Sequence, residues 1–147
     1  MTWKPHTTVA AVIERDGQFL MVEEEIDGRV VFNQPAGHLD PNESLHTAVI
    51  RETREETAWS FVPQAITGIY LWQLDASQRT YLRVAFCGSC SNHDTQQKLD
   101  DDIIRAVWMT REELLAQSNK LRSPMVMRCI DDYLAGQRYP LELLITL

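Results

Sequence analysis

Long apolar runs are absent from this sequence of 147 residues. A membrane-spanning helix needs about 18 or more consecutive apolar residues, and none are present. The opening residues, MTWKPHTTVA, contain no apolar stretch of the kind found in signal peptides. The sequence also lacks internal repeats and any linker rich in proline, glycine or serine. We therefore expect a single domain over residues 1–147, built around one sizeable core, in a cytoplasmic protein.

Positive charge is scarce. The 14 Lys and Arg residues are outnumbered by 21 Asp and Glu, which gives a formal net charge of -7. Nucleic-acid backbones are bound by clustered Lys and Arg, so we expect a small-molecule partner, with no nucleic acid and no membrane. An anionic substrate would need a metal ion or a local basic pocket. We expect a monomer or a homodimer.

Cysteine is sparse as well. Cys87, Cys90 and Cys129 are odd in number, which suits a reducing compartment better than a disulfide framework. The spacing CGSC would allow half of a zinc site or a redox pair. However, the second pair of a zinc site is missing, and these cysteines follow the strand-like run TYLRVAF instead of opening a helix. We interpret them as small residues at the end of a strand.

The apolar runs that are present are short and separated by turns. Residues 7–14 and 18–24 flank the turn RDG, which is typical of a β-hairpin, and a second Asp-Gly turn follows. Leu82, Val84 and Phe86 alternate with Tyr81, Arg83 and Ala85, as in a strand. The further strands are expected at residues 29–37, 65–74, 80–88 and 103–109.

Helix signals lie between and after these strands. Thr110 and Glu113 form a capping box for a short helix. Ser123 and Pro124 open a later helix that Gly136 can close. With five or so strands, three helices and no strict βαβ alternation, the sequence predicts an α+β fold, specifically an α/β/α sandwich with a mixed central sheet.

A further helix precedes these two in the chain. It is expected to begin at about Pro41, with Asp40 as its N-cap and Glu43 in the capping-box position. At about 100° per residue, Glu52, Glu55 and Glu56 then fall on the stripe that faces the core. Buried carboxylates without partners cost several kcal/mol each, so we expect a positive group there.

Dense carboxylate oxygens are suited to Mg²⁺, with Mn²⁺ as a possible substitute. Arg51 precedes Glu55 by four residues and can orient its carboxylate. The alternative is a solvated acidic helix face with i,i+4 charge pairs.

The spacing of these residues resembles the Nudix box, G-x5-E-x7-R-E-U-x-E-E-x-G-U, where U is a bulky apolar residue. Residues 37–59, GHLDPNESLHTAVIRETREETAW, match it at every charged position. The resemblance implies a Nudix fold with a catalytic loop-helix-loop and Mg²⁺-dependent hydrolysis, in which a metal-activated water attacks phosphorus. The alternative is a non-catalytic Nudix-fold module that binds a nucleotide or a protein. Such modules are expected to lose box glutamates, which this chain retains.

The resemblance also implies roles for individual residues. Arg51, Glu52 and Glu55 would be catalytic, and Glu43 would be structural. An acid from outside the helix often completes the site, and the run KLDDDII offers Asp100, Asp101 and Asp102, each of which could equally be a polar loop residue. The implied metal-binding positions are Gly37, Glu52, Glu55 and Glu56.

Two positions depart from the box. Thr53 occupies an apolar position, and Ala58 replaces the glycine that follows the helix. A left-handed residue at Ala58 would be strained. Because alanine is a strong helix former, we expect the helix to run through Ala58 in right-handed geometry.

The resemblance extends beyond the box, because the segments TWKPHTTVAAVI, FNQPAGHLD and SNKLRSPMVMRCIDDYLAGQRYPLELL are similar to one group of bacterial phosphatases within this family. This similarity implies release of orthophosphate from 4-amino-2-methyl-5-hydroxymethylpyrimidine diphosphate, from thiamine diphosphate and, less selectively, from nucleoside di- and triphosphates.

Other polar and aromatic residues are weaker candidates. Arg122 and Arg138 offer planar forks of donors that could contact phosphate, or they could pin the C-terminal segment to the body. Trp72 and Tyr70 could stack on a substrate ring or pack in the core. His38 is adjacent to Gly37 and is more typical of a surface histidine.

Overall fold

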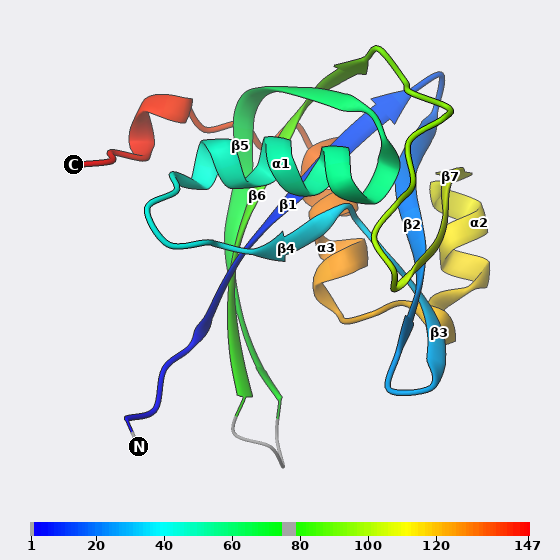
Figure 1. Ribbon diagram of the computed structural model, residues 1–147, viewed down its shortest axis with the longest axis horizontal. Helices are drawn as coiled ribbons and strands as arrows, with labels where there is room; N and C mark the ends of the chain where they lie inside the picture. Colours follow the sequence, from blue (N-terminus) through cyan, green and yellow to red (C-terminus); the bar gives the residue numbers. More distant parts are fainter. Residues whose placement is uncertain (1, 75–78) are drawn as a thin grey trace.

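The computed structural model describes residues 2–74 and 79–147. Figure 1 shows a twisted sheet with α1 in front of it and α3 behind it. In chain order the elements are β1 (His6–Arg15), β2 (Gln18–Ile26), β3 (Arg29–Asn33), β4 (Ala36–His38), α1 (Leu45–Thr57), β5 (Ser60–Leu74), β6 (Arg79–Ser91), β7 (Ile103–Thr110), α2 (Arg111–Ala116), the 3₁₀ turn η1 (Ser118–Lys120), α3 (Met125–Leu134) and the 3₁₀ turn η2 (Leu141–Leu143).

The sheet is mixed because β1 has neighbours of both directions. It pairs with β2 over two residue pairs next to their shared turn. Asp16 and Gly17 in that turn have φ of 52° and 79°, the left-handed conformations that a two-residue hairpin turn requires. The earlier residues of β1 pair in parallel with β6 and antiparallel with β4. Strand β2 pairs with β3 and β7, and β5 pairs with β6.

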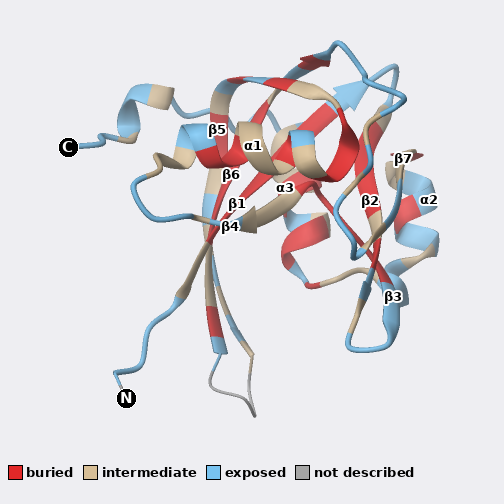
Figure 2. Ribbon diagram, viewed as in Figure 1, coloured by how far each residue is buried: buried red, intermediate tan, exposed pale blue. Residues whose placement is uncertain are grey.

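Helices cover both faces of this sheet. Val9 and Ala11 of β1 pack in one buried cluster with Val49 of α1. Val12 belongs to a second cluster with Ile130 of α3. Figure 2 shows buried residues concentrated where β1, β6 and the two helices meet. The predicted α/β/α sandwich is therefore confirmed, with the core split into two layers by the sheet.

Helix α1 begins four residues later than predicted. Its N-cap is Ser44, whose Oγ accepts a hydrogen bond from the Thr47 N–H at 3.0 Å. Asn42 has φ of 62°, which a right-handed helix cannot accommodate. Asp40 and Pro41 therefore belong to the preceding loop, and the prediction that they start the helix is wrong.

The end of α1 also differs from the prediction. Ala58 is left-handed, with φ of 63° and ψ of 15°, and its N–H donates to the Arg54 carbonyl at 2.9 Å. The expected right-handed path is wrong because the chain must reverse within two residues to enter β5 at Ser60. A Cβ in this conformation costs roughly 1 to 2 kcal/mol.

The strand predicted at residues 29–37 is divided into β3 and β4, which pair with β2 and β1 respectively, and the strand predicted at residues 65–74 begins earlier, at Ser60. Other local predictions agree with the structure. The Thr110–Glu113 capping box is present, and Gly136 is left-handed just after α3. Cys87, Cys90 and Cys129 are buried and free, and Cys87 and Cys90 lie near the end of β6, as expected for small residues at the end of a strand. Within residues 2–74 and 79–147, no helix combines the length and apolarity needed to cross a membrane.

Candidate active site

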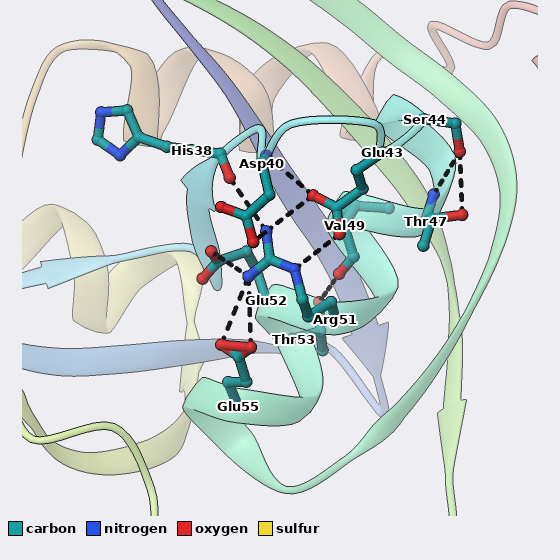
Figure 3. Close-up of polar contacts among 10 residues, drawn as sticks. All are labelled: His38, Asp40, Glu43, Ser44, Thr47, Val49, Arg51, Glu52, Thr53 and Glu55. Atoms are coloured by element: carbon teal, nitrogen blue, oxygen red, sulfur yellow. Dashed lines mark hydrogen bonds and ion pairs between the residues drawn. The ribbon is translucent and has the colours of Figure 1, made fainter. Parts of the chain in front are cut away.

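Arg51 is the centre of the polar network on α1. Its guanidinium donates twice to Glu43, from Nε at 2.7 Å and from Nη2 at 2.9 Å. Its Nη1 reaches Glu52 at 2.8 Å and Glu55 at 3.3 Å. Figure 3 shows this one side chain surrounded by three box carboxylates and by Asp40. Arg51 thus supplies positive charge to Glu52 and Glu55, but it forms no ion pair with Glu56.

The contacts between Arg51 and Glu43 shift the pKa values of the two side chains in opposite directions. The Arg51 hydrogen bonds hold the pKa of Glu43 below its usual value and raise the pKa of Arg51 itself. Burial raises the pKa of Glu52, although Arg51 opposes that shift. Glu43 is therefore a fixed anchor for Arg51, whereas Glu52 is a carboxylate whose charge is only partly compensated.

Glu56 is more deeply buried and has no cationic partner among the described residues. It is 8% exposed, and its Oε1 accepts a hydrogen bond from the Ala36 N–H at 2.9 Å. Burial raises its pKa well above the ordinary value, and the nearby carboxylates of Glu24 and Glu52 add to the shift. A cation bound here would stabilise the ionised form.

The acidic run before β7 contributes one residue to this network. Carboxylate oxygens of Glu52, Glu55 and Asp100 lie within 4.8 Å of one another. Asp101 is exposed and pairs with Lys98 at 3.5 Å. Asp102 lines the cavity beside Glu52 and Glu56. The structure thus brings Asp100 into the cluster, places Asp102 near it and leaves Asp101 outside.

Gly37 and Thr53 have clear structural reasons in this site. A Cβ on Gly37 would overlap the Glu52 carboxylate, so glycine at this position leaves room for the Glu52 side chain as it is placed here. Thr53 is fully buried on the face of α1 that packs on the sheet, and its hydroxyl donates to the Val49 carbonyl at 2.7 Å. The departure from an apolar residue at Thr53 leaves no unsatisfied hydroxyl.

A cavity of 340 Å³ opens beside Glu52 and Glu56. One residue on its wall, Glu24 of β2, was not singled out from the sequence. It is 7% exposed, burial raises its pKa, and Arg122 approaches it at 3.6 Å. Glu24 belongs to a run of three glutamates, and nothing local distinguishes it from its neighbours.

Arg83 is a second unanticipated residue on the cavity wall. It is 3% exposed and donates to the side-chain oxygens of Gln34 at 2.8 Å and Asn33 at 3.0 Å. Its Nε has no hydrogen-bond partner, and among the residues described no carboxylate forms an ion pair with it. A buried cation thus lies on the same cavity as the buried carboxylates of Glu24 and Glu56.

The weaker candidates separate into two groups. Arg122, Trp72 and His38 line the 340 Å³ cavity. Tyr70 instead lies in a larger cavity of 820 Å³ between β5, α3 and the C-terminal segment, where its hydroxyl donates to Asp132 at 2.8 Å. Arg138 donates to the backbone carbonyls of Tyr133 and Gln137 and lies over the Tyr133 ring, so it holds the turn that follows α3. Trp72 borders both cavities.

Comparisons with known proteins agree with this geometry. A family model described as NUDIX domain matches residues 4–129. Phosphatase NudJ of Escherichia coli (strain K12) is 43% identical over 142 residues, which covers 97% of this chain and 92% of the phosphatase. Phosphatase NudJ of Shigella flexneri matches with the same identity and coverage.

Solved structures give the same result. A NUDIX hydrolase from Nitrosomonas europaea is 48% identical and superposes with a TM-score of 0.96, covering 98% of each chain. A MutT protein from Methanosarcina mazei Go1 is 25% identical, with a TM-score of 0.71 over 94% of this chain and 100% of that chain. The family model, the identity to curated relatives and the shared fold together confirm the resemblance carried by residues 37–59, and the chain belongs to the Nudix hydrolase family.

Proposed function

We propose that this enzyme is a Mg²⁺-dependent phosphohydrolase of small diphosphates and triphosphates. One observation carries the proposal: carboxylate oxygens of Glu52, Glu55 and Asp100 lie within 4.8 Å of one another, and Glu52 also lines the 340 Å³ cavity together with Glu56. Like charges at this distance repel. Such an arrangement is best explained by a cation that compensates them.

The donor set fits a hard divalent cation. The available ligand atoms are carboxylate oxygens, which Mg²⁺ and Mn²⁺ prefer, whereas Zn²⁺ sites usually contain histidine or cysteine. Glu52, Glu55, Glu56 and Asp100 would hold the cation, and Gly37 leaves the room that Glu52 needs. When bound, Mg²⁺ supplies positive charge for the phosphate oxygens and lowers the pKa of a bound water.

The side chains of the chain would share the remaining work. Arg51 holds Glu52 and Glu55 in fixed orientations through charged hydrogen bonds. Glu52 or Glu55 would accept the proton of the attacking water. The water oxygen forms a bond to phosphorus, the anhydride P–O bond breaks, and orthophosphate is released. Glu43 has no direct part in this step and anchors Arg51.

The cavity beyond the glutamates would hold the organic part of the substrate. Its 340 Å³ lies within the common range for small-molecule sites. Tyr81 stacks on Trp72 with ring centroids 5.6 Å apart, and Asn33 and Arg122 supply polar groups on the wall. We propose as substrates 4-amino-2-methyl-5-hydroxymethylpyrimidine diphosphate, thiamine diphosphate and nucleoside di- and triphosphates.

The 43% identity to enzymes named Phosphatase NudJ supports orthophosphate as the product. We further propose that the enzyme acts in the cytoplasm as a monomer or a homodimer, which size-exclusion chromatography with light scattering would test.

Phosphate release is the direct test. The purified protein, stripped with EDTA, is expected to release orthophosphate from thiamine diphosphate and GDP only when Mg²⁺ is restored. An early GTP digest should contain GDP and orthophosphate. GMP with pyrophosphate and no GDP would contradict the phosphatase assignment, while nucleotide binding without any turnover would favour the non-catalytic module.

A further inference from the structure

The loop between β6 and β7, residues 92–102, crosses the C-terminal end of α1. The Asp94 N–H donates to the Ala58 carbonyl at 3.0 Å, and the Asp100 N–H donates to the Glu55 carbonyl at 3.1 Å. The last carbonyls of a helix have no partner within the helix. The β6–β7 loop therefore caps α1 from outside.

One pair of side chains closes this contact in both directions. Gln97 Nε2 donates to the Arg54 carbonyl at 2.6 Å, and Arg54 Nε donates to Gln97 Oε1 at 3.2 Å. Arg54 also holds Ser60 Oγ at 2.8 Å, at the start of β5. Gln97 is thus fastened to the backbone and to the side chain of the same helical residue.

The other end of the loop is attached to a different element. The Glu25 N–H of β2 donates to the Asp102 carbonyl at 3.0 Å, and the Ile103 N–H donates to the Asp100 carbonyl at 2.9 Å. Asp100 thus lies between an attachment to α1 and an attachment to β2. Its position depends on both.

Electrostatics makes such fastening necessary. The carboxylates of Glu52, Glu55 and Asp100 repel one another at the short separations seen here. Glu52 and Glu55 are held by Arg51 and by the helix itself. Asp100 is on a loop, so repulsion would displace it unless the loop is held against α1.

We propose that Gln97 and Arg54 are positioning residues that hold Asp100 in the acidic cluster, so that the cluster is preorganised for a divalent cation. This inference rests on the proposed function. Neither residue belongs to the carboxylate cluster or lines the 340 Å³ cavity. Their effect is transmitted through the backbone of residues 97–100 to the Asp100 carboxylate.

Calorimetric titration of the EDTA-stripped protein with Mg²⁺ tests the inference without turnover. Gln97→Ala is expected to weaken Mg²⁺ binding about 10-fold or more, as is typical when an outer partner of a metal ligand is lost. The free energy of unfolding without metal should hardly change, because Gln97 is partly exposed. Lys98→Ala, in the same loop, and Ser60→Ala, which removes the other Arg54 contact, are matched controls and should bind Mg²⁺ like the parent.

A double-mutant cycle with Asp100→Asn separates positioning from a direct effect. If Gln97 acts through Asp100, adding Gln97→Ala to Asp100→Asn should weaken Mg²⁺ binding no further. Additive losses, or parent-like binding by Gln97→Ala, would overturn the inference and leave the proposed function intact. A parent protein that binds no Mg²⁺ would overturn both.

Discussion

The two cavities of this enzyme differ in chemistry more than in size. The larger, of 820 Å³, lies between β5, α3 and the C-terminal segment, and it is bordered by the exposed aliphatic side chains of Ile69 and Leu71. The smaller, of 340 Å³, has buried Glu24 and Glu56 on its wall together with buried Arg83. Burying charge costs free energy that exposed aliphatic residues do not cost.

This difference shows what distinguishes an active site from a surface hollow. A protein tolerates an open groove lined by exposed side chains at little expense, but it retains buried, repelling carboxylates only where other interactions compensate them. Volume alone would select the larger cavity. The convergence of side chains from β2, α1 and the β6–β7 loop selects the smaller one.

The largest expected effect separates the two cavities by activity. Glu56→Gln should lower kcat at least about 100-fold, which corresponds to a loss of roughly 3 kcal/mol of transition-state stabilisation. Asp132→Asn, in the larger cavity, should leave kcat within about twofold. Steady-state phosphate release measures both, and a Glu56→Gln enzyme within fivefold of the parent would remove Glu56 from the ligand set.

Arg51 tests whether the orientation of the carboxylates matters as well as their presence. Arg51→Lys keeps the charge but cannot donate twice to Glu43 while also reaching Glu52 and Glu55. We expect kcat to fall about 10- to 100-fold, with a higher Mg²⁺ concentration needed for half-maximal rate. An unchanged Mg²⁺ requirement would mean that Arg51 has no role in orienting the ligands.

The pH dependence of stability should report the charge buried in the smaller cavity. Because the pKa of Glu56 is raised above 4.5 in the folded protein, the folded state binds more protons than the unfolded state above that pH. The contribution of Glu56 to the free energy of unfolding is therefore fully present below about pH 4.5 and is lost as the pH rises through the raised pKa. The free energy of unfolding falls by at most about 1.4 kcal/mol per pH unit in this range.

Urea unfolding in EDTA at several pH values measures this effect. The stability difference between Glu56→Gln and the parent should grow in favour of the variant as the pH rises. Excess Mg²⁺ should reduce the difference, since it stabilises the ionised glutamate in the parent. A difference that does not depend on pH would show that Glu56 titrates alike in both states.

The smallest effect concerns a residue outside both cavities. Ala58→Gly should relieve the left-handed strain and stabilise the fold by roughly 0.5 to 1 kcal/mol, after the added freedom of glycine in the unfolded chain is subtracted. Activity should stay within about twofold, because the carboxylates keep their spacing. Denaturant unfolding gives the sign, and a destabilised variant would contradict the strain.

Much of this architecture could be predicted from local sequence. The two Asp-Gly turns predicted the hairpins, because these turns need a left-handed backbone that Asp and Gly adopt readily. The alternation of apolar residues predicted β6. Glu55 follows Glu52 by three residues and Arg51 by four, so the helical repeat predicts that its carboxylate lies beside both.

Features that depend on tertiary contacts could not be predicted. Arg83 alternates with apolar residues as an outward-facing position would, yet α3 covers that face and buries it. Glu24 is buried because β2 carries it next to Glu56, although both its neighbours in sequence are glutamates too. Ala58 is left-handed because the chain reverses there to enter β5, and helix propensity carries no information about the direction of the chain after the helix.

A crystal structure with Mg²⁺ and a non-hydrolysable diphosphate analogue tests the central claim most directly. We expect the metal about 2.0–2.1 Å from carboxylate oxygens of the Glu52, Glu55, Glu56 and Asp100 set, with the organic group of the analogue in the 340 Å³ cavity. A diphosphate seated in the 820 Å³ cavity between β5 and α3, or a metal held away from the box glutamates, would contradict the account.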